Sequence, residues 1–179
     1  MNKYGFALAD YDPRAGLISL LPELRAYARF LTRGRAEADD LVQDAITNAL
    51  GALEHFDPHS NLRAWVFTIL RNRFYEQSRR RRSESAAVVQ AVSQRGPGAP
   101  DQHDRLNLSD LERQLYRLPP LLREALMLVG AHGLAYEEAA QICGVPVGTL
   151  KARVSRARAQ LALAMRNAEV ADPDTRPLT

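Results

Sequence analysis

A stretch rich in glycine and proline interrupts this chain between two regions that both have the composition of helices. The stretch runs Arg95-Gly-Pro-Gly-Ala-Pro-Asp-Gln-His-Asp104, which cannot continue a helix and offers little to bury. On either side leucine, alanine, arginine, glutamate and glutamine dominate, and the alternation of β-branched residues that is typical of strands is absent. We therefore predict an all-α fold in which two small helical domains are joined by a flexible linker.

The same changes in composition indicate where the domains, the linker and the tails begin and end. We predict an N-terminal tail at 1–14, a first domain at 15–83, the linker at 84–107, a second domain at 108–168 and a C-terminal tail at 169–179. The spacing of apolar residues predicts helices over 17–33, 36–54, 61–82, 108–117, 120–131, 135–142 and 147–166. A short helix over 84–94 is also possible, which leaves the state of that part of the linker open. Each domain has only about 60 to 70 residues, a size at which a hydrophobic core is marginal on its own.

Charge is spread unevenly along the chain. The 179 residues carry a net charge of +3, and all but two of the 24 basic residues are arginine. Residues 36–62 contain acids but no lysine or arginine, whereas 63–82 and 148–167 are rich in arginine. Abundant arginine reflects either the base composition of a genome or recognition of phosphate and carboxylate groups by guanidinium, and composition alone leaves both open. The separation of the charges predicts separate partners for separate surfaces.

Several classes of protein are disfavoured. No apolar run approaches the roughly 20 residues that span a bilayer, and the N-terminus lacks the basic and apolar stretches of a secretory signal. We therefore expect a cytoplasmic protein with no membrane insertion. Cys143 cannot form an internal disulfide or hold zinc alone, and we expect it to be a small buried apolar residue rather than a redox sensor.

Residues 136–161 carry the strongest local pattern. A short helix that ends at Gly144 is followed by a tight turn, Val145-Pro146-Val147, and then by a longer helix. This is the helix-turn-helix layout, whose second helix enters the major groove of DNA. At about 100° per residue, a core stripe is formed by Leu150, Val154, Ala157 and Leu161. The opposite side carries Lys151, Ala152, Ser155, Arg156 and Ala159, where small residues let the helix sink into a groove and long basic residues reach base edges. Arg153 and Arg158 lie on the flanks, where phosphates would run; a solvated basic face is the alternative interpretation.

Two helices of the first domain also present distinct faces. Around 40–53, helical spacing predicts a core stripe of Val42, Ile46, Ala49 and Leu53. Another face carries Asp40, Gln43, Asp44 and Thr47, which suits a basic protein partner, although an ordinary solvated face has the same composition.

In the next helix the predicted core stripe is Leu62, Trp65, Val66 and Ile69, with Ser60 or Asn61 as the cap. We expect Trp65 to lie in the core rather than to stack on a base. The outward residues are Arg63, Thr68, Arg71, Asn72, Tyr75 and Arg79. Basic residues interleaved with aromatic and amide side chains favour single-stranded nucleic acid.

Taken together, these motifs resemble the bacterial RNA polymerase sigma factors of the extracytoplasmic-function (ECF) class. Asp40-Leu-Val-Gln-Asp44 is similar to region 2.2, which binds the polymerase clamp helices. Residues 62–72 resemble regions 2.3 and 2.4, which melt and read the −10 element, and residues 145–158 resemble region 4.2, which reads the −35 element. Two further features resemble the EcfG type, which serves the general stress response: the run Arg79 to Arg82 and the sequence Leu118-Pro-Pro-Leu-Leu-Arg-Glu-Ala125.

The resemblance implies roles for individual residues. Core polymerase would be bound by Asp40, Leu41, Gln43, Asp44 and Thr47. DNA of the −10 element would be bound by Phe56, Asn61, Arg63, Arg71, Asn72, Tyr75 and Arg79, with Asn72 and the loop 56–61 holding a flipped base. DNA of the −35 element would be bound by Thr149, Lys151, Arg153, Ser155, Arg156 and Arg158. Two departures stand out: Ala152 replaces a residue that is often polar in the family, and Arg73-Phe-Tyr-Glu76 places its acid further from Asn72 than many members do.

The resemblance implies an initiation factor whose partners are core RNA polymerase, promoter DNA and an anti-sigma factor, and which is monomeric when free. No cofactor, metal or enzymatic activity is expected. His55 and His59 flank Pro58 and lack a third ligand, and the adjacent acids at 39–40 and 137–138 point to different faces. Two alternatives remain open: a conventional helix-turn-helix regulator, and a sigma-like mimic that sequesters an anti-sigma factor.

Overall fold

The computed structural model describes residues 12–32, 34–91 and 110–171, and every element in these ranges is helical. The chain divides into two compact units, Met1–Pro100 and Asp101–Thr179. The predicted all-α fold with two helical domains is therefore confirmed. The limits given above for the domains, tails and linker stay predictions, because the first and last residues and 92–109 lie outside the described residues.

In the part of the chain that the structure describes, no helix combines the length and the apolar character that a membrane span requires.

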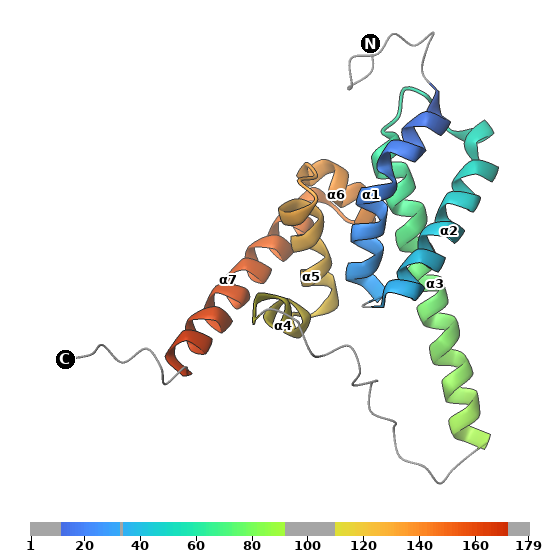
Figure 1. The fold of residues 1–179 in the computed structure, drawn as a ribbon. Helices are drawn as coiled ribbons and strands as arrows, with labels where there is room; N and C mark the ends of the chain where they lie inside the picture. Colours follow the sequence, from blue (N-terminus) through green and yellow to red (C-terminus); the bar gives the residue numbers. More distant parts are fainter. Residues whose placement is uncertain (1–11, 33, 92–109, 172–179) are drawn as a thin grey trace. The chain divides into compact units, whose positions relative to one another are not determined.

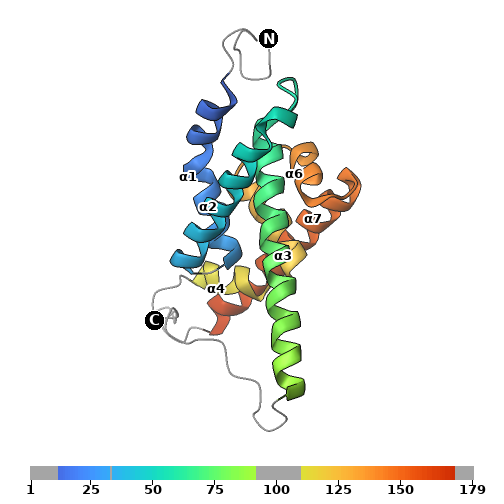
Figure 2. The same cartoon turned by 90° about the vertical axis from the view of Figure 1, so that its right-hand side faces the viewer.

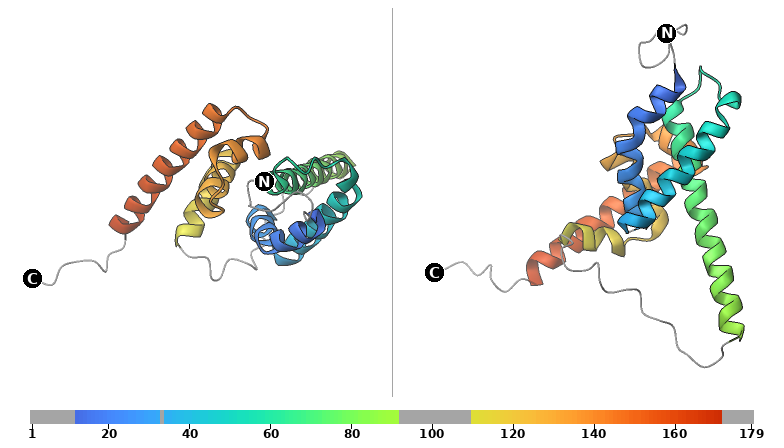
Figure 3. Two further views of the ribbon diagram at one scale, coloured as in Figure 1. Left: turned by 90° about the horizontal axis from the view of Figure 1, so that it is seen from above. Right: turned by 45° about the vertical axis from the view of Figure 1, so that its right-hand side comes forward.

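Among its described residues the first unit contains the α-helices α1 (Pro13–Thr32), α2 (Arg35–Gly51) and α3 (Leu62–Ala91). They pack around a shared core, and the view from above shows them grouped around one axis (Figure 1 and Figure 3, left). At its centre the rings of Tyr27 and Phe67 stack with their centroids 5.3 Å apart, and both side chains are fully buried. Such an aromatic pair stabilises the core beyond the area that it buries. The C-terminal part of α3 runs on past α1 and α2 (Figure 2).

The ends of these helices differ from the prediction mainly at three places. The first helix begins at Pro13 rather than 17. The second helix ends at Gly51 rather than 54 and is followed by a short 3-10 helix, η2 (Leu53–His55). The third helix continues to Ala91, so the first residues of the predicted linker are helical. Asn61 is the cap of α3, since its Oδ1 accepts the amide N–H of Ala64 at 3.1 Å. Ser60 instead bonds back to the Asp57 carbonyl within the preceding turn.

The core stripes were only partly correct. Along α2, Val42 and Ala49 are buried as predicted, but Ile46 and Leu53 are only half-buried. The buried arc of α2 also includes Ala38, Leu41 and Ala45, because α2 packs against both α1 and α3 and therefore buries a wide surface. Along α3, Leu62 and Val66 are buried as predicted, Trp65 and Ile69 are half-buried, and Phe67 and Leu70 are fully buried instead.

The second unit is organised around one long helix. Its elements are α4 (Asp110–Arg117), α5 (Pro120–Leu126), a π-helical turn η4 (Met127–Ala131), α6 (Tyr136–Cys143) and α7 (Val147–Ala171). Helices α4, α5 and α6 pack against α7 (Figure 3, left). Leu150, Val154 and Ala157 of α7 are buried as predicted, while Leu161 is half-buried. The core stripe predicted for the long helix is thus largely confirmed.

The turn between α6 and α7 has the geometry that its sequence predicts. Gly144 ends α6 in the left-handed conformation, at φ +64°, and the amide of Val145 donates back to the Ala140 carbonyl at 3.1 Å. Glycine is favoured at such a C-terminal cap because a side chain would be strained there. Cys143, on the last turn of α6, is buried as predicted.

Gly144 provides a test of this turn. Replacing Gly144 with Ala is expected to destabilise the second unit by about 1–2 kcal/mol, because an L-residue is strained at positive φ. A Cβ at Gly144 would meet nothing within 4 Å, so the cost is conformational rather than steric. Gly148 offers a matched control: it also has open space for a Cβ, but it lies in the first turn of α7 without positive φ. Gly148→Ala should be neutral or stabilising. Hydrogen exchange of the α6 and α7 amides in the full chain measures both; equal protection in the two variants would contradict the prediction.

Candidate polymerase and nucleic-acid interfaces

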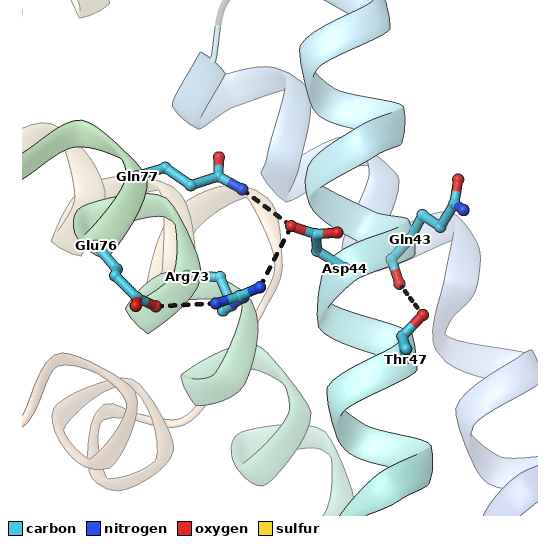
Figure 4. Close-up of polar contacts among 6 residues, drawn as sticks. All are labelled: Gln43, Asp44, Thr47, Arg73, Glu76 and Gln77. Atoms are coloured by element: carbon cyan, nitrogen blue, oxygen red, sulfur yellow. Dashed lines mark hydrogen bonds and ion pairs between the residues drawn. The ribbon is translucent and has the colours of Figure 1, made fainter. Parts of the chain in front are cut away.

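The outward side of α2 is a polar, acidic face. Asp40, Gln43 and Thr47 are exposed, and the Thr47 hydroxyl donates to the Gln43 carbonyl at 2.9 Å (Figure 4). Together with α3 this face forms a surface hollow, whose lining is Glu37, Asp40, Gln43, Asp44, Gln77 and Arg81. Three of the residues predicted to bind polymerase are therefore brought together at one depression.

Leu41 differs from the other residues of the predicted polymerase-binding set. Its side chain is fully buried, so it packs in the core of the first unit, and its contact with polymerase stays a prediction. The motif Asp40-Leu-Val-Gln-Asp44 thus combines two roles. Leu41 and Val42 point inward, while Asp40 and Gln43 point outward, as helical spacing requires.

Asp44 has internal partners that the sequence did not predict. Its Oδ2 accepts a hydrogen bond from Gln77 Nε2 at 3.1 Å and lies 3.5 Å from Arg73 Nη2 (Figure 4). Arg73 also pairs with Glu76 on its own helix at 3.0 Å, and about two turns further along α3 Arg81 pairs with Glu37 at 3.3 Å. The i, i+4 spacing of 73, 77 and 81 was visible in the sequence. Only the packing of α3 against α2 reveals which acids these residues face.

The other side of α3 presents a mixed aromatic, amide and basic face. Trp65, Thr68, Asn72, Tyr75 and Arg79 recur at helical spacing and lie on this one face. Asn72 and Arg79 are exposed, and the Arg71 guanidinium stacks over the Tyr75 ring at 4.7 Å. Planar groups of this kind are suited to stacking against unpaired bases. Trp65 was expected in the core, but it is half-buried and belongs to the edge of this face.

Three residues predicted to bind −10 DNA are otherwise engaged. Phe56 is buried and packs against Trp65 with ring centroids 4.9 Å apart, so it supports this face from below, and its contact with DNA stays a prediction. Asn61 uses its Oδ1 to cap α3. Arg63 donates from Nε to a Glu23 carboxylate oxygen on α1 at 2.8 Å. Asn61 and Arg63 thus have structural roles at the start of α3, and their contact with DNA stays a prediction.

The outward face of α7 is basic and follows the prediction closely. Thr149, Lys151, Ser155, Arg156 and Arg158 are exposed, and Arg153 is half-buried on a flank. Lys151 extends over the ring of Tyr136, the first residue of α6, at 5.6 Å from Nζ to the centroid. This contact holds the lysine near the start of α7, where a recognition helix meets base edges. Ala152 is half-buried and adds no polar group.

Within residues 12–32, 34–91 and 110–171, no group of three or more His, Cys, Asp or Glu side chains is arranged to hold a metal ion.

Comparison with known proteins shows to which family the chain belongs. The family model "Sigma-70 region 2" matches residues 17–84, and the model "Sigma-70, region 4" matches residues 108–161. The chain is also 44% identical over 148 residues to the ECF RNA polymerase sigma factor EcfG of Rhodopseudomonas palustris, covering 83% of this chain and 82% of that one. The chain belongs to the ECF sigma factors. The region 2 match covers most of α1, all of α2 and α3 as far as residue 84, and the region 4 match covers α4 to α6 and the first part of α7.

Solved structures agree with this assignment. The sigma factor RpoE from Bartonella quintana, in complex with the anti-sigma factor NepR, is 42% identical to this ECF sigma factor with a TM-score of 0.71, covering 86% of this chain and 96% of that one. CnrH, in complex with the cytosolic domain of CnrY, is 26% identical with a TM-score of 0.64, covering 89% and 93% of the two chains.

Leu41 and its neighbour Asp40 test the division between core and surface in α2. Leu41→Ala is expected to lower the free energy of unfolding by about 2–5 kcal/mol, because it leaves a cavity in the core. Asp40→Ala, on the exposed side, should change it by no more than about 0.5 kcal/mol. Denaturant titration followed by the fluorescence of Trp65, the single tryptophan of the chain, reports on this unit. Leu41→Ala with wild-type stability would contradict the burial described above.

Proposed function

We propose that this ECF sigma factor docks on core RNA polymerase through the acidic face of α2 and directs promoter recognition and melting through α3 and α7. The observation that carries the proposal is the separation of an acidic face on α2 from the nucleic-acid-type faces of α3 and α7. Carboxylates repel phosphates, so the α2 face suits a basic protein surface, whereas the arginine-rich faces suit DNA. The proposal places the chain in the cytoplasm and assigns it no reaction of its own.

At the −10 element, the outward face of α3 would hold the melted strand. Asn72 is exposed and offers both a donor and an acceptor, which is what reading the edge of a flipped base requires. The stacked pair of Arg71 and Tyr75, with the half-buried Trp65, supplies planar groups nearby. Unstacking a base costs a few kcal/mol, which these contacts would offset.

The first experiment is run-off transcription with purified core polymerase on a promoter library. An ECF sigma factor with these faces should direct initiation from a defined subset of promoters, and core polymerase alone should not. Gel-shift and binding assays on the same purified protein distinguish the two alternative functions. A conventional helix-turn-helix regulator would shift duplex DNA by itself, and a sigma-like mimic would bind an anti-sigma factor without supporting transcription. No initiation above the core-alone level would overturn the proposal.

At the −35 element, Arg156 and Arg158 are proposed to have different roles. Arg156 lies on the side that faces base edges, so Arg156→Ala should cost about 1–3 kcal/mol of discrimination between bases at one position. Arg158 lies on a flank, where phosphates would run. Arg158→Ala should therefore weaken binding to all −35 sequences alike and reduce the salt dependence of that binding. Transcription from a library randomised at −35 measures both effects. Equal loss of discrimination in the two variants would contradict this division.

We also propose that the chain serves a stress response and is held inactive by an anti-sigma factor. The solved relative RpoE is in complex with the anti-sigma factor NepR, and CnrH is in complex with the cytosolic domain of CnrY. A second hollow lies between α1 and α2. Its lining combines apolar and polar residues with three arginines and one acid: Leu21, Arg25, Arg29, Arg35, Asp39, Val42, Gln43, Ile46 and Thr47. This composition suits an amphipathic helix with acidic residues along one edge. Because Gln43 lines both hollows, such a helix would hinder docking of polymerase.

Charge reversal tests this groove. Arg29→Glu should weaken binding of NepR from Bartonella quintana, used as the probe, by at least about tenfold, because it opposes an acidic partner. Arg14→Glu is the control: it makes the same change of charge on an exposed residue of α1 that does not line the groove. Calorimetric titration of the full chain measures both affinities. Equal affinities for the two variants would place the anti-sigma partner elsewhere on the molecule.

A further inference from the structure

We infer that Gln77 and Arg73 of α3 are positioning residues for polymerase docking, which hold the Asp44 carboxylate so that one of its oxygens is presented to the partner. The inference rests on the function proposed for the acidic face of α2. It adds two residues from another helix, neither of which belongs to the motif at 40–44. Their part is to orient Asp44, not to touch the polymerase.

The contacts around Asp44 all involve the same oxygen. Gln77 donates to Oδ2 at 3.1 Å, and Arg73 Nη2 lies 3.5 Å from that atom, both from the α3 side (Figure 4). Within the part of the chain that the structure describes, Oδ1 accepts no hydrogen bond, and the Asp44 side chain is 46% exposed. A carboxylate held through one oxygen keeps the other available, in a fixed direction, to a cationic donor of a partner. The ordering of the side chain is then complete before binding, which favours affinity.

Stability alone does not account for Arg73. Its ion pair with Asp44 is long and partly exposed, and such pairs contribute little to stability. Its Nε is buried with no hydrogen-bond partner among the described residues, which is a cost to the fold. The guanidinium is nevertheless held between Glu76 at 3.0 Å and Asp44 (Figure 4). A side chain kept in place at a cost is expected where its position serves a function.

Gln77 is the better residue to test, because it carries no charge. Gln77→Leu removes the donor to Asp44 without altering the net charge of the surface. Gln77→Lys keeps a donor that can reach Oδ2, and Gln77→Glu places a second carboxylate beside the first. Ser78→Ala serves as a matched control, since Ser78 is the next residue of α3, is half-buried and takes no part in the Asp44 cluster.

The measurement is the affinity of each full-length variant for purified core RNA polymerase. Gln77→Leu should bind about 3- to 10-fold more weakly, the loss expected when one side chain must be ordered on binding. Gln77→Glu should lose more affinity than Gln77→Leu. Gln77→Lys and Ser78→Ala should bind core polymerase with an affinity within about twofold of wild type. Full affinity in Gln77→Leu would overturn the inference, as would failure of Gln77→Lys to restore binding. Denaturant titration followed by Trp65 fluorescence identifies any variant that does not fold, and the remaining variants then decide.

A double-mutant cycle with Asp44→Asn separates positioning from direct contact. If Gln77 acts through Asp44, Gln77→Leu should have no further effect once Asp44 is neutral. The same loss in both backgrounds would mean that Gln77 contacts the polymerase itself or only stabilises the helix pair, and would overturn the inference. Wild-type affinity in Asp44→Asn would instead overturn the proposed role of the acidic α2 face, so the two failures are distinguishable.

Discussion

The position of α2 between α1 and α3 is the constraint on which the first unit depends. A helix that packs on two neighbours must bury a wide arc, and α2 does so with Leu41 and with small residues such as Ala38, Ala45 and Ala49. Alanine lets helix axes approach closely. Helices α1 and α3 also contact each other directly, through the stacked rings of Tyr27 and Phe67. The side of α2 that faces away from these neighbours stays exposed and carries Glu37, Asp39 and Asp40. The acidic residues lie on this side because carboxylates are costly to bury without partners.

Helix α3 serves two surfaces because its opposite sides have different surroundings. One side carries Arg73, Gln77 and Arg81 toward the acids of α2, where Gln77 and Arg73 contact Oδ2 of Asp44 and Arg81 pairs with Glu37. The other side carries Asn72 and Tyr75 outward, next to the half-buried Trp65. The arginines of this helix are therefore not one basic patch. Arg73 and Arg81 face protein carboxylates, whereas Arg79 is exposed on the opposite side of the helix.

The second unit has a simpler arrangement, because its long helix α7 is buried along one side only. Leu150, Val154 and Ala157 fill the core, and the left-handed Gly144 turns the chain so that α6 supports α7 near its start. Lys151 is drawn over Tyr136 by this arrangement. The remaining polar residues of α7 extend from a rigid helix, which is the form in which side chains read the major groove most reproducibly.

The sequence by itself determined the helical class, the two units, the helix-turn-helix with its buried stripe, and the motifs by which the family is recognised. These follow from periodicity, turn chemistry and residue order, which are local properties. Only the tertiary structure decided that Leu41 and Phe56 are buried, that Ile46 and Trp65 are not fully buried, and that Asp44 is held by Gln77 and Arg73. The physical reason is that helical spacing says which residues share a face, whereas the packing of neighbouring helices decides how wide the buried face is and which charges meet across it.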